Sequence, residues 1–174
     1  MQNYLKAGQV KVLVLVFTLI LVVSDLVFYF QMQKVEHIGI AVRSLSVSIP
    51  LFEKLLDCSC YKTEDVESEK VRTAFFRIGE TKIELIESIE QNGVINRFIE
   101  KKGEGIHHIA FEVTDIETEV ERLTNKGFTV LNDTPHKGAD EKLVCFLHPK
   151  STGGVLVELC QSINPTAQKN KNPV

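Results

Sequence analysis

The sequence predicts an α+β fold in which two copies of a β-α-β-β-β module form one mixed, curved sheet. The first observation is a repeated stretch: VEHIGIAV, which ends at Val42, recurs as IHHIAFEV, which ends at Val113. The second is a pair of strand-like segments, KIEL around Glu84 and VLVEL around Glu158, each with one acid near its end. Self-similarity at a fixed spacing is typical of an internally repeated fold.

The first half contains the elements of one module. Residues 35–42 alternate and are rich in β-branched residues, which predicts a strand. Residues 46–56 carry Val47, Leu51 and Leu55 at helical spacing, and Pro50 is tolerated in the first turn of a helix. Further strands are predicted over residues 60–67, 71–78 and 82–86, and a short helix over residues 94–102 that ends at Gly103.

The second half repeats this order. A strand is predicted over residues 106–113, and a helix capped by Asp115 ends at Gly127. Strands follow at residues 128–131, 142–147 and 154–159, with a polar loop through residues 137–140. We therefore expect one domain over residues 32–161, with modules at about 34–87 and 105–160 joined by the helix 94–102, and a flexible tail over residues 162–174.

The first 31 residues form a hydrophobic extension outside the predicted fold. Residues 12–23 are continuously apolar, and Asp25 interrupts the apolar stretch that runs to Phe30. The unbroken run is short for a bilayer-spanning helix and is followed by no small-x-small cleavage site. It could be a membrane anchor, an uncleaved signal, or a translated upstream region; we favour the last, with the start at Met32.

Composition excludes several classes of protein. The net charge of −3 provides no basic surface for nucleic acid. The four cysteines have no CxxC spacing, and Cys145 and Cys160 lie in apolar strand patterns where a thiol acts as a small hydrophobe. These features favour a cytoplasmic globular protein, with membrane association only if residues 12–30 act as an anchor.

Four residues of the repeat are predicted to meet. Side chains alternate across a strand, so only one of His107 and His108 can share the face of His37, and the repeat selects His108. A pseudo-twofold axis between the modules would bring equivalent strands onto one surface, where His37, Glu84, His108 and Glu158 converge. Two imidazoles and two carboxylates suit a borderline divalent ion with open positions for substrate. A buried glutamate would otherwise be costly on an apolar face.

A simpler interpretation exists for each residue alone. A histidine in a strand is commonly a hydrogen-bonded core residue, and a glutamate at a strand end commonly faces solvent. The recurrence of both residue types in both modules favours a site. We expect His107 to point away, His136 to be solvated in a loop, and His148 to contact a ligand or close a hairpin.

The motifs resemble a known family. They are similar to the vicinal-oxygen-chelate (glyoxalase-like) superfamily, and within it to the methylmalonyl-CoA epimerases. The matching stretches are VEHIGIAV, KIELIE, INRFIEKKG, GIHHIAFEV and FLHPKSTGGVLVEL, and the resemblance covers residues 32 to about 161.

The resemblance implies a metal-dependent epimerisation of methylmalonyl-CoA within propionate metabolism. The metal would be Co²⁺ in the first place, with Mn²⁺, Ni²⁺, Zn²⁺ or Mg²⁺ as alternatives, held by the four residues above. Glu158 and Glu84 are the expected pair that removes and returns the C2 proton. Some family members carry Gln at the position of Glu84 and a separate Glu on the preceding strand, where this chain has Thr73.

Further expectations concern CoA, assembly and alternative activities. Lys150 and Ser151, or the pair Lys101 and Lys102, could contact the CoA phosphates, and the resemblance implies a homodimer. Two alternatives remain open: a glyoxalase I-type lactoylglutathione lyase, which uses the same four-ligand arrangement, and a non-catalytic ligand-binding protein of the superfamily. Ring-cleaving dioxygenases are disfavoured, since they need iron with a single carboxylate ligand.

Overall fold

The computed structural model describes residues 32–132 and 134–164. The apolar extension over residues 1–31, with its possible anchor, and residues 165–174 of the predicted tail lie outside the described part. The elements are β1 (Lys34–Ala41), α2 (Leu45–Leu56), β2 (Lys62–Val66), β3 (Val71–Ile78), β4 (Thr81–Ser88), α3 (Val94–Lys102), β5 (Gly105–Glu112), α4 (Ile116–Asn125), β6 (His136–Lys137), β7 (Lys142–Leu147), the 3₁₀ turn η1 (Pro149–Ser151) and β8 (Val157–Ser162).

The eight strands form one mixed sheet that is symmetric about its centre. The strand order is β2-β3-β4-β1-β5-β8-β7-β6, so each module contributes four adjacent strands. The first strands of the modules, β1 and β5, pair antiparallel at the centre, and each pairs parallel with the last strand of its own module. The predicted paired-module fold is confirmed.

The two faces of this curved sheet differ in chemistry because side chains alternate along each strand. The outer face carries apolar residues, including Ala74, Phe76 and Leu85 in the first module and Cys145, Leu147 and Leu159 in the second. The inner face instead carries buried charged residues, among them Lys82, Glu84, Lys142 and Glu158. These buried charges indicate that a functional site lies on the inner face.

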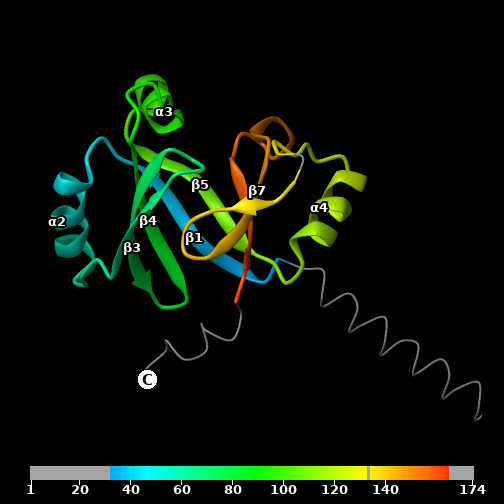
Figure 1. The fold of residues 1–174 in the computed structure, drawn as a ribbon, viewed down its shortest axis with the longest axis horizontal. Coiled ribbons are helices and arrows are strands. Elements are labelled where there is room, and N and C mark those ends of the chain that lie inside the picture. The colour runs from blue at the N-terminus through cyan, green and yellow to red at the C-terminus, as the bar shows by residue number, and fades with distance from the viewer. Residues whose placement is uncertain (1–31, 133, 165–174) are drawn as a thin grey trace, which may run out of the picture.

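One helix covers the outer face of each module. Figure 1 shows α2 and α4 on opposite flanks of the molecule, with the strands between them. Helix α2 packs on β3 and β4, and α4 packs on β7 and β8. The apolar stripe expected on α2 faces outward, with Val47, Leu51 and Leu55 exposed at 70%, 60% and 69%. The packed stripe includes Leu45, Ile49, Phe52 and Leu56 instead.

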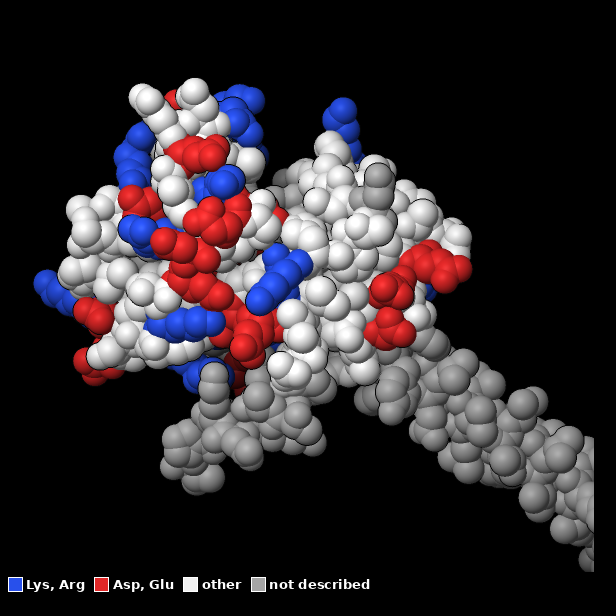
Figure 2. Space-filling view, in the orientation of Figure 1, with Lys and Arg blue, Asp and Glu red and all other residues white. Residues whose placement is uncertain are grey.

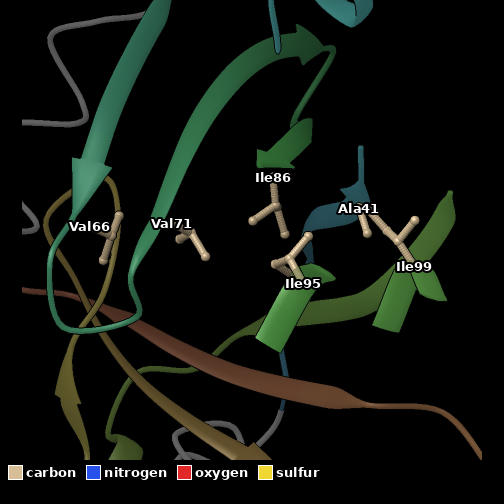
Figure 3. Close-up of a cluster of buried hydrophobic side chains, with 6 residues drawn as sticks. All are labelled: Ala41, Val66, Val71, Ile86, Ile95 and Ile99. Carbon is tan, nitrogen blue, oxygen red and sulfur yellow. The ribbon is translucent and has the colours of Figure 1, made fainter. Parts of the chain in front are cut away.

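Helix α3 closes the inner side of the first module. Figure 3 shows Ile95 and Ile99 of this helix facing Ala41 of β1 and Ile86 of β4. Ala41 lies four residues after His37, and Ile86 two residues after Glu84, so both extend the inner face past the predicted ligands. The helix thereby seals one end of that face with apolar side chains.

The second module departs from the predicted strand boundaries. Residues 128–131 form only a single bridge, between Val130 and Leu147, so the prediction of a strand there is wrong. The second strand of the module is instead β6, which pairs His136 with Val144. The last strand begins at Val157 and not at residue 154, because the chain before it turns at Gly153 and Gly154. These glycines have positive φ angles of 70° and 94°. It extends to Ser162, one residue beyond the expected domain end.

The charged side chains at the surface are mixed in sign. On the face in Figure 2, basic and acidic side chains are mixed over the half that holds the first module, and the other half carries fewer charges, with a group of acidic side chains over α4. Within residues 32–132 and 134–164, no helix is both long and apolar enough to cross a membrane.

The caps of α2 and α4 provide a test of local stability. The Asp115 carboxylate accepts a hydrogen bond from the Thr118 backbone N–H at 3.2 Å, whereas Ser44 at the N-cap of α2 makes no side-chain cap bond. We expect Asp115→Ala to lower the free energy of unfolding by about 1 kcal/mol. The matched variant Ser44→Ala should cost clearly less, and equal losses in urea unfolding would contradict this difference.

Candidate metal centre

The four predicted ligands come together on the inner face at the centre of the sheet. His37 lies on β1, Glu84 on β4, His108 on β5 and Glu158 on β8. All four side chains are buried, with 4–6% of each residue exposed. These are the four central strands, so the pairing of β1 with β5 brings together the halves of the site.

The ligand atoms point at a common centre. His37 Nε2 lies 2.9 Å from His108 Nε2. Glu84 Oε2 is 3.2 Å from the His37 nitrogen and 3.6 Å from the His108 nitrogen. Glu158 Oε2 is 3.5 Å and 3.1 Å from the same two atoms.

The backbone beneath the cluster contains small residues at equivalent places. In the sheet register Gly39 is paired with both Glu84 and His108. Ala110 is likewise paired with both His37 and Glu158. A Cβ atom added to Gly39 would lie 2.3 Å from Cε1 of the His108 ring, so this imidazole occupies the space over the glycine. A side chain at Gly39 is therefore incompatible with the His108 position.

Each ligand histidine has a partner for its second ring nitrogen. His37 Nδ1 is 2.6 Å from Glu36 Oε2, and His108 Nδ1 is 3.0 Å from His107 Nδ1. Such outer partners fix the tautomer and orientation of a metal-binding imidazole. His107 does not point away, as the alternation rule had suggested, but lines the same cavity as His108.

The partners reach their histidines because both central strands contain a β-bulge. The pairing of β1 with β5 shifts register between Val35 and His37, which leaves Glu36 as the extra residue. A second shift leaves His107 as the extra residue of β5. A bulge re-aims the side chain of the extra residue and breaks strict alternation. Sequence reasoning missed Glu36 for this reason.

The charges within the cluster favour ionised groups. Burial alone would raise the pKa of Glu84, but the imidazoles of His37 and His108 outweigh it and lower the pKa to about 2. The pKa of Glu158 is lowered for the same reason. Burial alone would lower the pKa of His37, but the carboxylates of Glu158 and Glu84 raise that pKa well above its usual value. In contrast, burial and the neighbouring His108 lower the pKa of His107 to about 4.

This donor set fits a divalent ion. Ligand atoms lie about 2.0–2.2 Å from such an ion, so two ligands at right angles are separated by about 3 Å. The five separations that involve a histidine nitrogen run from 2.9 to 3.6 Å, and nitrogen with carboxylate oxygen suits borderline first-row ions. Two buried carboxylates also require positive charge nearby. His37, Glu84, His108 and Glu158 would hold the ion.

A cavity of about 660 Å³, part of it open to solvent, leads to the cluster. Its apolar wall includes Phe75, Ile86, Val94, Ile95, Val144 and Phe146. Its polar lining includes Lys82, Lys142, Asp140 and Glu69, all outside the ligand set. The mixed lining suits a small organic ligand with both polar and apolar parts.

The remaining predicted residues lie elsewhere or serve structure. Lys150 and Ser151 belong to η1, outside the cavity lining; Lys150 is exposed, and Ser151 Oγ accepts a hydrogen bond from the Thr129 backbone N–H. His148 caps η1, its Nδ1 accepting from the Lys150 backbone N–H. His136 is not in a loop but on β6, where it pairs with Glu69. Thr73 is buried on β3 and lines the cavity.

Fold and site define the class of protein. The model of the Glyoxalase/Bleomycin resistance protein/Dioxygenase superfamily matches residues 36–146, and the chain belongs to this superfamily. Among its relatives, uncharacterized protein YqjC of Bacillus subtilis is 38% identical over 130 residues, covering 75% of this chain and 93% of the relative. The ethylmalonyl-CoA/methylmalonyl-CoA epimerase of Cereibacter sphaeroides is 37% identical over 130 residues, covering 74% and 97%.

A solved structure has the same fold. The methylmalonyl-CoA epimerase of Streptomyces coelicolor, as an S→T variant in complex with 2-nitronate-propionyl-CoA, superposes with a TM-score of 0.74 at 32% identity. The match covers 76% of this chain and 96% of that one. Within the superfamily, the chain belongs to the methylmalonyl-CoA epimerase family, so the predicted family is confirmed.

Proposed function

We propose that this protein is a metal-dependent epimerase that interconverts (R)- and (S)-methylmalonyl-CoA. The observation that carries the proposal is the convergence of His37, His108, Glu84 and Glu158 at the end of a cavity. Relatives named methylmalonyl-CoA epimerases support the substrate, because they align over nearly the whole domain.

The reaction requires removal of a weakly acidic proton from C2, between a thioester and a carboxylate. A divalent ion bound by the cluster would supply positive charge where negative charge develops on the substrate oxygens. Glu36 and His107 hold the imidazoles of His37 and His108 in place by hydrogen bonds to Nδ1. The apolar cavity wall limits the access of water to C2 once its proton has been removed.

Epimerisation needs one group on each face of C2. Glu158 removes the proton at a carboxylate oxygen and Glu84 returns one from the other side, or the roles reverse for the other epimer. The two residues come from different modules related by the pseudo-twofold axis. This favours their approach to C2 from opposite faces, which epimerisation requires. His37 and His108 lower the pKa of both glutamates, which weakens each of them as a base. Glu69, which lines the cavity outside the cluster, is the alternative base against which the assignment is tested.

The test is epimerase activity before and after removal of metal. Purified protein should interconvert the two epimers of methylmalonyl-CoA, lose this activity after chelation, and regain it with Co²⁺, Mn²⁺, Ni²⁺, Zn²⁺ or Mg²⁺ added singly. The ion that restores activity at the lowest concentration identifies the preferred metal. Activity that survives complete chelation, checked by elemental analysis, would refute the metal dependence.

The same preparation separates the alternatives. Turnover of the glutathione hemithioacetal of methylglyoxal without epimerisation would identify a glyoxalase I-type lyase. Tight binding of acyl-CoA without turnover of either substrate, and without metal in freshly purified protein, would identify a ligand-binding protein.

A further inference from the structure

A tight turn of the second module reaches across the cavity to the first. The turn joins β6 to β7 over residues 138–141, and the Lys142 backbone N–H closes it on the Ala139 carbonyl at 3.1 Å. Asp140 and Glu141 at its tip have φ angles of 50° and 56°, in the left-handed region that non-glycine residues rarely adopt. Such strain persists only where surrounding contacts hold it.

Those contacts come from the side chain and backbone of Asp140. Asp140 Oδ2 lies 2.8 Å from Lys82 Nζ on β4, and Oδ1 lies 3.1 Å from Lys62 Nζ on β2. The Asp140 backbone N–H donates to Glu64 Oε2 at 2.9 Å. One residue of the second module thus accepts or donates three bonds across the cavity, all with the first module.

The contact with Lys82 continues to the ligand cluster. Lys82 Nζ lies 2.5 Å from Glu36 Oε1, while the other oxygen of Glu36 contacts His37 Nδ1 at 2.6 Å. Lys142 Nζ approaches the same Glu36 Oε1 at 3.2 Å. The side chains of Lys82, Glu36 and Lys142 are only 3–6% exposed, so these ion pairs are poorly screened by solvent.

Asp140 is the second acidic partner of Lys82. Lys82 Nζ contacts Glu36 and Asp140, whereas Lys142 Nζ contacts Glu36 and, at 3.4 Å, Glu112. Burial would raise the pKa of Asp140, but the nearby Lys82 and Lys62 lower it. Without Asp140, Lys82 would keep only Glu36 as an acidic partner among the described residues, so its ammonium group would be less firmly fixed beside the carboxylate that orients His37.

The first module offers no matching path to His108. The repeat spacing of 71 residues places Glu69 of the first module where Asp140 stands in the second. Glu69 also reaches across to the opposite module, but it pairs with His136 on β6. The outer partner of His108 is His107, which contacts the ring of Phe98 with centroids 4.9 Å apart. The ionic connection is therefore specific to the His37 side.

We propose that Asp140 is a positioning residue: it holds the 138–141 turn over the cavity and, through Lys82 and Glu36, keeps the His37 imidazole oriented for metal binding. This inference rests on the proposed metal site. Asp140 contacts none of the four ligand residues itself; its effect passes through Lys82, which it holds against the carboxylate of Glu36.

The experiment is a double-mutant cycle on metal affinity, read by competition with a chelator for Co²⁺ alone. Glu36→Gln should weaken Co²⁺ binding roughly 10–100-fold, the usual loss for an outer partner of a ligand histidine. Asp140→Asn should weaken it by about tenfold, at the lower end of that range. Because both act along one path, the double variant should bind no more than about twofold more weakly than Glu36→Gln.

Two further measurements separate positioning from general stability. Asp65→Asn removes the same charge from an exposed pair with Arg72 on the β2–β3 hairpin and should leave Co²⁺ affinity unchanged. The visible absorption of bound Co²⁺ should shift in Asp140→Asn and not in Asp65→Asn, while metal-free thermal unfolding shows whether each variant is folded. If Asp140→Asn does not fold, Lys62→Met loosens the same carboxylate and should weaken binding in the same direction.

The outcomes are distinct. Wild-type affinity in Asp140→Asn, or losses that multiply in the double variant, would overturn the inference and leave the proposed function intact. Failure of the wild-type protein to bind any divalent ion would overturn both.

Discussion

Replacing Glu158 or Glu84 with glutamine should slow exchange of the C2 proton of methylmalonyl-CoA by about 10²–10⁴-fold, the range for loss of a general acid or base. Glutamine keeps an oxygen that can face the ion but cannot accept the proton. Exchange into D₂O should be measured with each epimer separately at saturating metal. If one glutamate serves each face, Glu158→Gln should impair proton removal from one epimer and Glu84→Gln removal from the other.

Glu69→Gln is the matched control for this experiment. It removes another carboxylate of the same cavity that lies outside the ligand cluster, and under the two-glutamate scheme it keeps proton exchange near the wild-type rate. If both cluster variants keep wild-type exchange with metal bound, the scheme is wrong. Loss of exchange in Glu69→Gln alone would move the base to that residue.

A single methyl group at Gly39 should disable the site. The new Cβ would lie 2.3 Å from the His108 ring, far inside van der Waals contact, so the imidazole must move. We expect Gly39→Ala to lower the free energy of unfolding by about 1–3 kcal/mol, the cost of overpacking. Displacement of a ligand by about 1 Å should also reduce the epimerisation rate by roughly a hundredfold. Chemical denaturation and steady-state kinetics measure the two effects.

Ala110 provides the control, because it occupies the equivalent place between His37 and Glu158. Ala110→Gly removes a methyl group instead of adding one and should cost about 1 kcal/mol of stability. It should keep an epimerisation rate near that of the wild type. An equal loss of rate in both variants would show that the effect of Gly39→Ala is not specific to the His108 ring.

The repeat explains why the four central residues could be found in advance. Each module carries one histidine and one glutamate at equivalent strand positions, so the pseudo-twofold that builds the sheet also gathers them. The outer partners could not be found in this way. Alternation assigns Glu36 to the face opposite His37, and only a bulge set by the partner strand β5 reverses this. Lys82 lies two residues before Glu84, so alternation places both side chains on the same face of the sheet. Nothing in the sequence, however, distinguishes a buried lysine from an exposed one.

Other misses have similar causes. Helix α2 has apolar residues on most of its sides, so periodicity could not choose between Val47, which is exposed, and Phe52, which packs on Phe76. Residues 128–131 have strand-like composition, but Phe128 and Val130 pack into the core beneath α4 with only one bridge to β7. In both cases tertiary packing overrides local propensity.

The two modules meet where β1 pairs antiparallel with β5. A half-length chain ending after β4 would leave β1 as an open edge, and an open edge accepts another strand. Its self-complementary partner is a second identical half, joined edge to edge. Such a pair would place two histidines and two glutamates around one axis, so a gene half as long could assemble a comparable four-donor centre before duplication fused the halves and let their surroundings diverge.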